Sequence, residues 1–141
     1  PALFQESYWS AGMGVASRHS TEKQVALARD LLAQNSCRTF LFINVAALHT
    51  PNRAYLPGCR ADNLESHAAA LRYVDQALAP LLDACAARAP TFAMVCSDHG
   101  SAYGEDGYRG HRVAHDSVWN VPYAHFFIPA LIDAQATGAA S

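Results

Sequence analysis

The stretch TFAMVCSDHG, residues 91–100, decides the fold class and also contains the clearest candidate for chemistry. Its first six residues carry no charge, which is typical of a strand buried inside a sheet. An acid and an imidazole, Asp98 and His99, follow directly where this strand ends, and Gly100 allows the chain to turn. A carboxylate beside an imidazole suits zinc or manganese. We therefore predict that Asp98 and His99 bind a divalent metal at the edge of a sheet.

A glycine-rich loop follows this strand and ends at a second candidate ligand. His111 returns twelve residues after His99 (111 − 99), and His115 lies four residues further on. That second interval is the spacing of two zinc-binding histidines on one helix face, although no helical glutamate accompanies the pair. Glu105 and Asp106, inside the loop, are interpreted as surface charges.

Helical and strand-like patterns alternate along the rest of the chain. Ser20 or Thr21 can cap a helix that ends near Asn35. A long apolar stripe from Leu64 to Cys85 predicts a second helix, which Pro80 should kink or split. Strands are expected at residues 39–45, 91–96 and 123–128. This order predicts an α/β fold, a three-layer sandwich with a mostly parallel sheet and site residues at the carboxyl ends of strands.

The composition excludes several classes of protein. The chain has 141 residues, of which 51% are hydrophobic and 16% charged, which fits one globular domain rather than a disordered chain. A net charge of −2 gives no electrostatic reason to bind nucleic acid. No apolar run approaches the ~20 residues that cross a bilayer. The four cysteines match no metal-binding pattern and are predicted to be buried reduced thiols, with a disulfide as the alternative.

The predicted strand at 39–45 leads to one further candidate, His49, in the loop Leu48-His49-Thr50-Pro51. Each candidate has a simpler alternative. Asp98 and His99 could form the cap of a helix. His111 and His49 could be polar loop residues without a special role.

These segments together resemble the sulfatase and phosphoethanolamine-transferase branch of the alkaline-phosphatase superfamily. The resemblance covers roughly residues 38–128, and its order and spacing make it more specific than the Ser-Asp-His-Gly motif alone. It depends on the following matches: Ser97-Asp98-His99-Gly100, Gly104-Glu105, Gly110-His111, the segment from Phe42 to Asn52, Tyr73-Val74-Asp75, and Val121-Pro122.

The resemblance implies a metal-dependent hydrolase or transferase that acts on a phosphate or sulfate ester. Asp98 and His99 would bind the metal, which would be zinc, manganese or calcium. His111 would bind a second metal or contact the oxygens of the transferred group, and His49 would be a substrate-side ligand or leaving-group acid. In this superfamily a Ser, Thr or modified Cys attacks phosphorus or sulfur in line.

The resemblance fails in one region. Nothing in residues 1–37 matches the superfamily's first metal-binding acid and its nucleophile, and Cys59 lacks the Cys-x-Pro-x-Arg context of a formylglycine. We therefore interpret residues 1–141 as the C-terminal part of a larger catalytic domain, with the nucleophile outside this chain. The isolated chain is expected to be nearly inactive and to pack against another copy or a missing N-terminal segment. Its closest resemblance, to cytoplasmic-looking bacterial hydrolases, predicts a cytoplasmic location.

Two other functions remain open at this stage. A non-catalytic metal-binding or interaction module derived from the same fold would use Asp98 and His99 structurally. A cofactor-independent mutase of the same superfamily would need two manganese sites, and this chain has ligands for about one and a half of them.

Overall fold

A computed structural model describes residues 3–131, which form two compact units at residues 3–81 and 82–131. The mixture of helices and strands confirms the predicted α/β class. The first unit contains the 3-10 turns η1 (Ala11–Met13) and η2 (Arg53–Tyr55), the helix α1 (Ser20–Gln34) and most of the helix α2 (Leu64–Arg88). The second contains the end of α2 and then β1 (Thr91–Cys96), β2 (Ala102–Tyr103), η3 (Glu105–Gly107), β3 (Arg109–Gly110), α3 (Asp116–Trp119) and β4 (Tyr123–Ile128).

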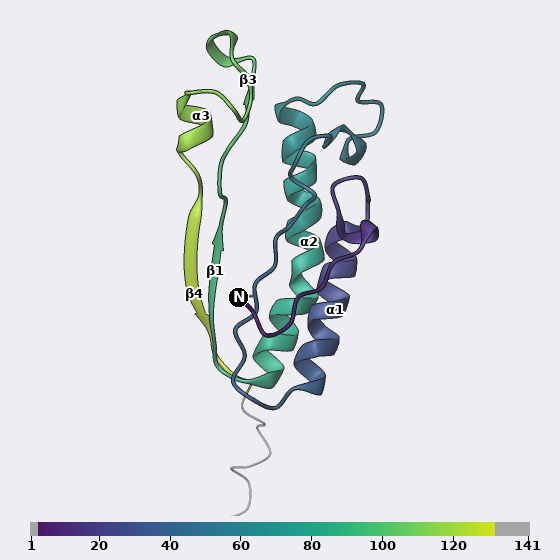
Figure 1. Cartoon of the computed structure of the whole chain (residues 1–141), viewed down its shortest axis with the longest axis vertical. Helices are drawn as coiled ribbons and strands as arrows, with labels where there is room; N and C mark the ends of the chain where they lie inside the picture. Colours follow the sequence, from purple (N-terminus) through teal and green to yellow (C-terminus); the bar gives the residue numbers. More distant parts are fainter. Residues whose placement is uncertain (1–2, 132–141) are drawn as a thin grey trace, which may run out of the picture. The chain divides into compact units, whose positions relative to one another are not determined.

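Both predicted long helices are present, and in the first unit α1 lies alongside α2 (Figure 1). The buried residues of α1 follow the helical period: Ser20, Thr21, Val25, Ala28 and Leu32. The buried residues of α2 in this unit are mostly small: Ser66, Ala69, Ala70, Val74 and Leu81. Leu64 and Leu71, which the apolar stripe placed inside, are exposed. Pro80 lies within α2 without splitting it into two elements.

The start of α2 is fixed by Asn63 and Ser66. The Ser66 backbone N–H donates to Asn63 Oδ1 (2.8 Å), and the Asn63 N–H donates to Ser66 Oγ (2.9 Å). This reciprocal pair satisfies two backbone donors, as a capping box does. Ser66 Oγ also donates to Oδ1 of the fully buried Asn52 (2.6 Å), so the loop before α2 is tied to the first turn of the helix.

Tyr73 of α2 joins this helix to α1. Its hydroxyl donates to Glu22 Oε2 (2.5 Å), and its ring stacks on Tyr55 with centroids 4.7 Å apart. Burial and the bond to Glu22 raise the pKa of Tyr73 to about 12. Burial alone would raise the pKa of Glu22, but the bonds from Tyr73 and His19 lower it overall. The ionised Glu22 therefore stabilises the protonated Tyr73, and the Tyr73 hydroxyl stabilises the ionised Glu22.

Replacing Tyr73 by Phe should lower the free energy of unfolding by about 1 kcal/mol at neutral pH, because one charge-assisted hydrogen bond is lost. The folded pKa lies above the ordinary value of 10.0, at about 12. The bond's contribution is therefore complete below pH 10 and disappears as the pH rises toward 12. In urea unfolding, the difference in free energy of unfolding between wild type and Tyr73→Phe should be smaller at pH 11 than at pH 7.

Tyr8 provides the matched control for this prediction, because it also donates to a glutamate, Glu6, but is exposed and only two residues away. Tyr8→Phe should leave the unfolding curve nearly unchanged. An equal loss in both variants would contradict the special role of Tyr73.

The expected strand at residues 39–45 is not formed, which corrects the sequence-based prediction. This segment has no regular secondary structure, and Phe40 and Phe42 are exposed. Its contacts are of other kinds: Phe4 stacks on both of these rings, and Gln24 Nε2 donates to the Asn44 carbonyl (2.7 Å). A strand needs a second strand to complete its hydrogen-bond ladder, and no strand of residues 3–131 pairs with this one.

The other two predicted strands are confirmed, and they form an antiparallel ribbon, β1 with β4 (Figure 1). Its register pairs Thr91 with Ile128 and Cys96 with Tyr123. The second small sheet, β2 with β3, is also antiparallel. The mostly parallel sheet expected from strand–helix–strand order is therefore not seen among the described strands, because both pairings that form among them are antiparallel.

Apolar side chains of the β1–β4 ribbon are exposed on both faces, with the larger group on one of them. Residues opposite one another in an antiparallel pair share a face, which groups Phe92, Met94, Phe127 and Tyr123 together. All four are exposed, although the apolar run predicted a strand covered on both sides. Such a surface is what the expected association with another copy or a further segment requires; that association remains a prediction.

None of the four cysteines forms a disulfide, as predicted, but none of them is buried either. Cys37 and Cys96 are exposed, while Cys59 and Cys85 are partly covered. Cys37 was expected in a strand-like run that is not formed, and Cys96 ends β1, most of whose side chains are exposed.

Candidate functional site

Asp98 and His99 lie immediately after the last residue of β1, as predicted. Ser97 continues the ribbon by donating its N–H to the Pro122 carbonyl (3.4 Å), and its hydroxyl donates to the His99 carbonyl (2.6 Å). The His99 N–H donates to Asp98 Oδ1 (3.0 Å). These bonds form a compact turn in which the Asp98 carboxylate remains 89% exposed.

The His99 ring is oriented by its own turn. Its Nδ1 lies 2.8 Å from the Gly100 carbonyl oxygen. A carbonyl can only accept, so Nδ1 carries the proton, and the neutral ring keeps its lone pair on Nε2. Nε2 lies 3.8 Å from Asp98 Oδ2. Two ligands of one tetrahedral zinc ion lie roughly 3.4 Å apart, given bond lengths near 2.1 Å. The distance between these two atoms is therefore compatible with a single divalent cation.

His111 is brought to His99 by the β2–β3 hairpin. Ala102 pairs with Gly110, the residue before His111, so the loop returns next to its own start. The rings of His99 and His111 stack, with centroids 4.5 Å apart and planes inclined by 21°. The structure thus brings together three of the predicted site residues.

The fit to a metal is partial. Among residues 3–131, no group of three or more His, Cys, Asp or Glu side chains is arranged to hold a metal ion. The nearly parallel planes of His99 and His111 explain this, because stacked rings direct their nitrogens side by side instead of toward one point. The spacing of Asp98 and His99 is compatible with two ligands, and the assignment of Asp98, His99 and His111 as metal ligands remains a prediction.

The glycine of the motif has a role that sequence analysis missed. The Gly100 N–H donates to the Val118 carbonyl of α3 (2.9 Å). A Cβ at this position would lie 2.0 Å from the Ser117 carbonyl oxygen. Gly100 is therefore needed for close packing against α3, in addition to the sharp turn that we expected. No sequence signal indicates this contact, because α3 begins sixteen residues later (116 − 100).

Glu105, interpreted as a surface charge, also holds the loop. Backbone N–H groups of Glu105 itself, Tyr103 and Gly104 lower the pKa of its carboxyl group. The bond from the Tyr103 N–H is 2.5 Å long. Because this pKa is depressed in the folded chain, the carboxylate supports the loop at neutral pH, and that support is lost as the pH falls through the folded pKa.

His115 does not form a helical zinc-binding pair with His111, which corrects that alternative. Residues 111–113 form a bend, and α3 begins only at Asp116. His115 is the N-cap of α3, and its side chain accepts from the Ser117 N–H. The remaining ring nitrogen lies 3.2 Å from Asp106 Oδ2.

His49 belongs to the first unit, so its distance from Asp98 remains a prediction. It is exposed, and its Nδ1 donates to the Thr50 carbonyl oxygen (2.6 Å). The Thr50–Pro51 bond that follows is cis. The ring is thus held against its own loop.

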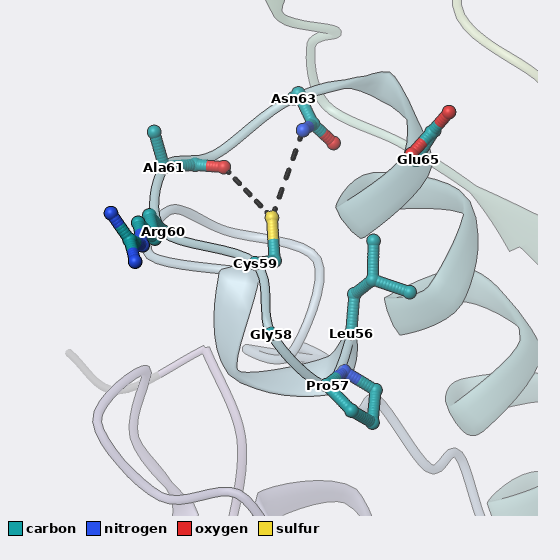
Figure 2. A pocket seen from close by; sticks show the side chains of 8 residues that line it. All are labelled: Leu56, Pro57, Gly58, Cys59, Arg60, Ala61, Asn63 and Glu65. Atoms are coloured by element: carbon teal, nitrogen blue, oxygen red, sulfur yellow. Dashed lines mark hydrogen bonds between the residues drawn. The ribbon is translucent and has the colours of Figure 1, made fainter.

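A cavity of about 340 Å³ in the first unit lies in the loop before α2 and contains none of the predicted site residues (Figure 2). Its lining is Leu56, Pro57, Gly58, Cys59, Arg60, Ala61, Asn63 and Glu65. Cys59 Sγ donates to the Ala61 carbonyl (3.0 Å) and accepts from Asn63 Nδ2 (3.7 Å). Both hydrogen bonds hold the Cys59 thiol within its own loop.

The sulfatase family model matches residues 3–132, almost the whole chain. The chain belongs to the sulfatase family. Membership supports a sulfate- or phosphate-ester hydrolase type of activity, and enzymes of this family generally use a divalent metal. No curated protein and no solved structure matches the chain. Within residues 3–131, no helix combines the length and the apolar character that a membrane span requires.

Proposed function

We propose that this sulfatase-family chain contributes a divalent-metal site to a hydrolase or transferase of phosphate or sulfate esters. The observation that supports it most directly is the 3.8 Å separation of His99 Nε2 and Asp98 Oδ2 at the end of β1. A bound metal would neutralise charge on the ester oxygens and favour in-line displacement. Zinc, manganese and calcium all accept a carboxylate ligand.

The chain's own residues have distinct roles in this proposal. Asp98 supplies negative charge, and His99 presents Nε2 because the Gly100 carbonyl holds the proton at Nδ1. His111 lies against the His99 ring and would bind the metal or an oxygen of the transferred group. His49 would act toward the substrate or its leaving group. No residue of this chain is proposed as the nucleophile.

A non-catalytic metal-binding module is the alternative function. The 89% exposure of the Asp98 side chain favours it. The two functions differ in what happens when the metal is removed from the native protein. Chelation should abolish ester hydrolysis if the site is catalytic, and should change only thermal stability if it is structural.

His49→Ala should lower the turnover number of the native enzyme by roughly 10²–10⁴-fold if this imidazole acts as a general acid. Metal content should stay unchanged, because His49 is assigned to the substrate and not to the metal. Steady-state kinetics with p-nitrophenyl phosphate and sulfate, together with elemental analysis, would test both statements.

His19 supplies the control for this variant, since it is also an exposed histidine of the first unit but pairs with Glu22 on the same helical turn (3.2 Å). His19→Ala should leave turnover nearly unchanged. A loss of metal in His49→Ala, or unchanged turnover, would remove the substrate-side role.

A further inference from the structure

His115 connects the two segments that carry the candidate site. Its Nε2 lies 3.2 Å from Asp106 Oδ2 in the glycine-rich loop, and its Nδ1 lies 2.9 Å from Ser117 Oγ in α3. The side chain of His115 is only 15% exposed, whereas that of Asp106 is 85% exposed. The Tyr108 ring covers the imidazole, with centroids 5.3 Å apart.

Both ring nitrogens of His115 have matched partners. The backbone N–H of Ser117 can only donate, and it points at Nδ1 (3.2 Å). Nδ1 is therefore the acceptor and Nε2 carries the proton. The carboxylate of Asp106 accepts from Nε2, which makes this a charge-assisted bond. One imidazole thus caps α3 and holds the loop at the same time.

α3 in turn fixes the segment with the predicted metal ligands. The Gly100 N–H donates to the Val118 carbonyl (2.9 Å), and its backbone lies against the Ser117 carbonyl. The Gly100 carbonyl orients the His99 ring (2.8 Å). The loop bound by His115 continues through β3 to His111. A chain of contacts therefore runs from His115 to both stacked histidines.

We propose that His115 is a positioning residue: together with Asp106 it holds the glycine-rich loop against α3, so that His111 stays stacked on His99. The catalytic consequence rests on the function proposed above. The structural consequence, order of the loop and of the His111 ring, does not depend on it.

A catalytic triad of Asp106, His115 and Ser117, with Ser117 as the nucleophile, explains the contacts of His115 less well. The backbone N–H of Ser117 already occupies Nδ1, the nitrogen that would have to accept the hydroxyl proton. Ser117 also lies in the first turn of α3, two residues from His115, which is the ordinary geometry of a helix cap.

Two variants remove the contact between His115 and Asp106, which we call the clamp, and retain the cap that residue 115 forms on α3. Asp106→Ala removes the contact to the loop and leaves His115 free to cap α3, but it also adds backbone strain, because Asp106 has a left-handed backbone (φ 49°). His115→Asn does not change this position and therefore separates the two effects. His115→Asn retains a side-chain oxygen for the cap, since Asn is a good N-cap residue, but is too short to reach Asp106. Asp83→Ala, which removes an exposed carboxylate from α2, serves as the control.

The first measurement uses NMR of the 141-residue chain without metal or substrate. Both clamp variants should raise amide exchange across residues 104–110 by about tenfold, as expected for one lost hydrogen bond, and should shift the His111 ring signals. Exchange of the Gly100 amide should change by less than about twofold, because the cap remains. The double variant should show no larger effect than either single variant.

The second measurement uses the native enzyme. Both clamp variants should lower kcat by about tenfold with little change in KM or metal content, since positioning and not binding is lost. Unchanged loop exchange and His111 signals in Asp106→Ala would overturn the proposal, whatever the enzyme's activity. So would loss of turnover in Ser117→Ala with the loop still ordered, which would indicate the triad.

Discussion

Asp98→Ala should abolish metal uptake by the native enzyme and lower its turnover by orders of magnitude. The variant removes the only negative charge of the Asp98–His99 pair, whose donor atoms lie 3.8 Å apart. Losing an outer partner of a metal ligand already costs about 10–100-fold in affinity or activity, so losing a ligand should exceed that range. Elemental analysis and steady-state kinetics on the same preparation would measure both effects.

Asp98→Asn separates charge from local structure in this experiment. Its Oδ1 can still accept from the His99 N–H, the bond that holds the turn at 3.0 Å. If the carboxylate acts through its charge, Asn should lose metal almost as completely as Ala while folding normally. Unchanged metal stoichiometry in both variants would sink the assignment of Asp98 as a ligand.

Local signals in the sequence were sufficient for the helices and for two strands. The helix predicted from Ser20 to Asn35 forms as α1 over Ser20–Gln34, because its apolar residues repeat at helical spacing. The strands at 91–96 and 123–128 form over the predicted residues. In each case the pattern lies within the element itself and needs no knowledge of a distant partner.

The strand predicted at 39–45 failed for the opposite reason. Its run from Phe40 to Ile43 is as apolar as β1, but strand formation depends on a pairing partner elsewhere in the chain. For the same reason, the sequence did not indicate that β1 and β4 pair with each other in antiparallel orientation. Composition and order indicate which segments can be strands, not which of them meet.

The sequence indicated the candidate ligands of the site but not the contacts that support them. Asp98, His99 and His111 could be recognised from residue type and order, and the structure brings these three together. The supporting contacts of Gly100 and His115 could not be recognised from the sequence. Each depends on α3, and the four residues of this helix carry no strong sequence pattern. Ligand candidates are visible in the sequence, whereas the contacts that hold them in place appear only in the fold.

Gly100→Ala should destabilise the second unit at the upper end of the roughly 1–3 kcal/mol that overpacking costs. The added methyl group would lie 2.0 Å from the Ser117 carbonyl oxygen and 3.0 Å from its carbon. These are backbone atoms, so no side-chain rearrangement can make room, and α3 itself must move. The Gly100–Val118 hydrogen bond should weaken with it, and the Gly100 amide should exchange faster.

Gly14→Ala is the matched control, since Gly14 has an extended backbone (φ −89°, ψ 176°) and an added Cβ would meet the Ala11 carbonyl at an ordinary 3.6 Å. It should change the free energy of unfolding by no more than about 0.5 kcal/mol. Urea unfolding of both variants, with amide exchange at Gly100, would compare them directly. Equal stabilities would contradict the close packing of Gly100 on α3. A large loss confined to Gly100→Ala would show that the motif glycine is needed for its contact with α3 as well as for its turn.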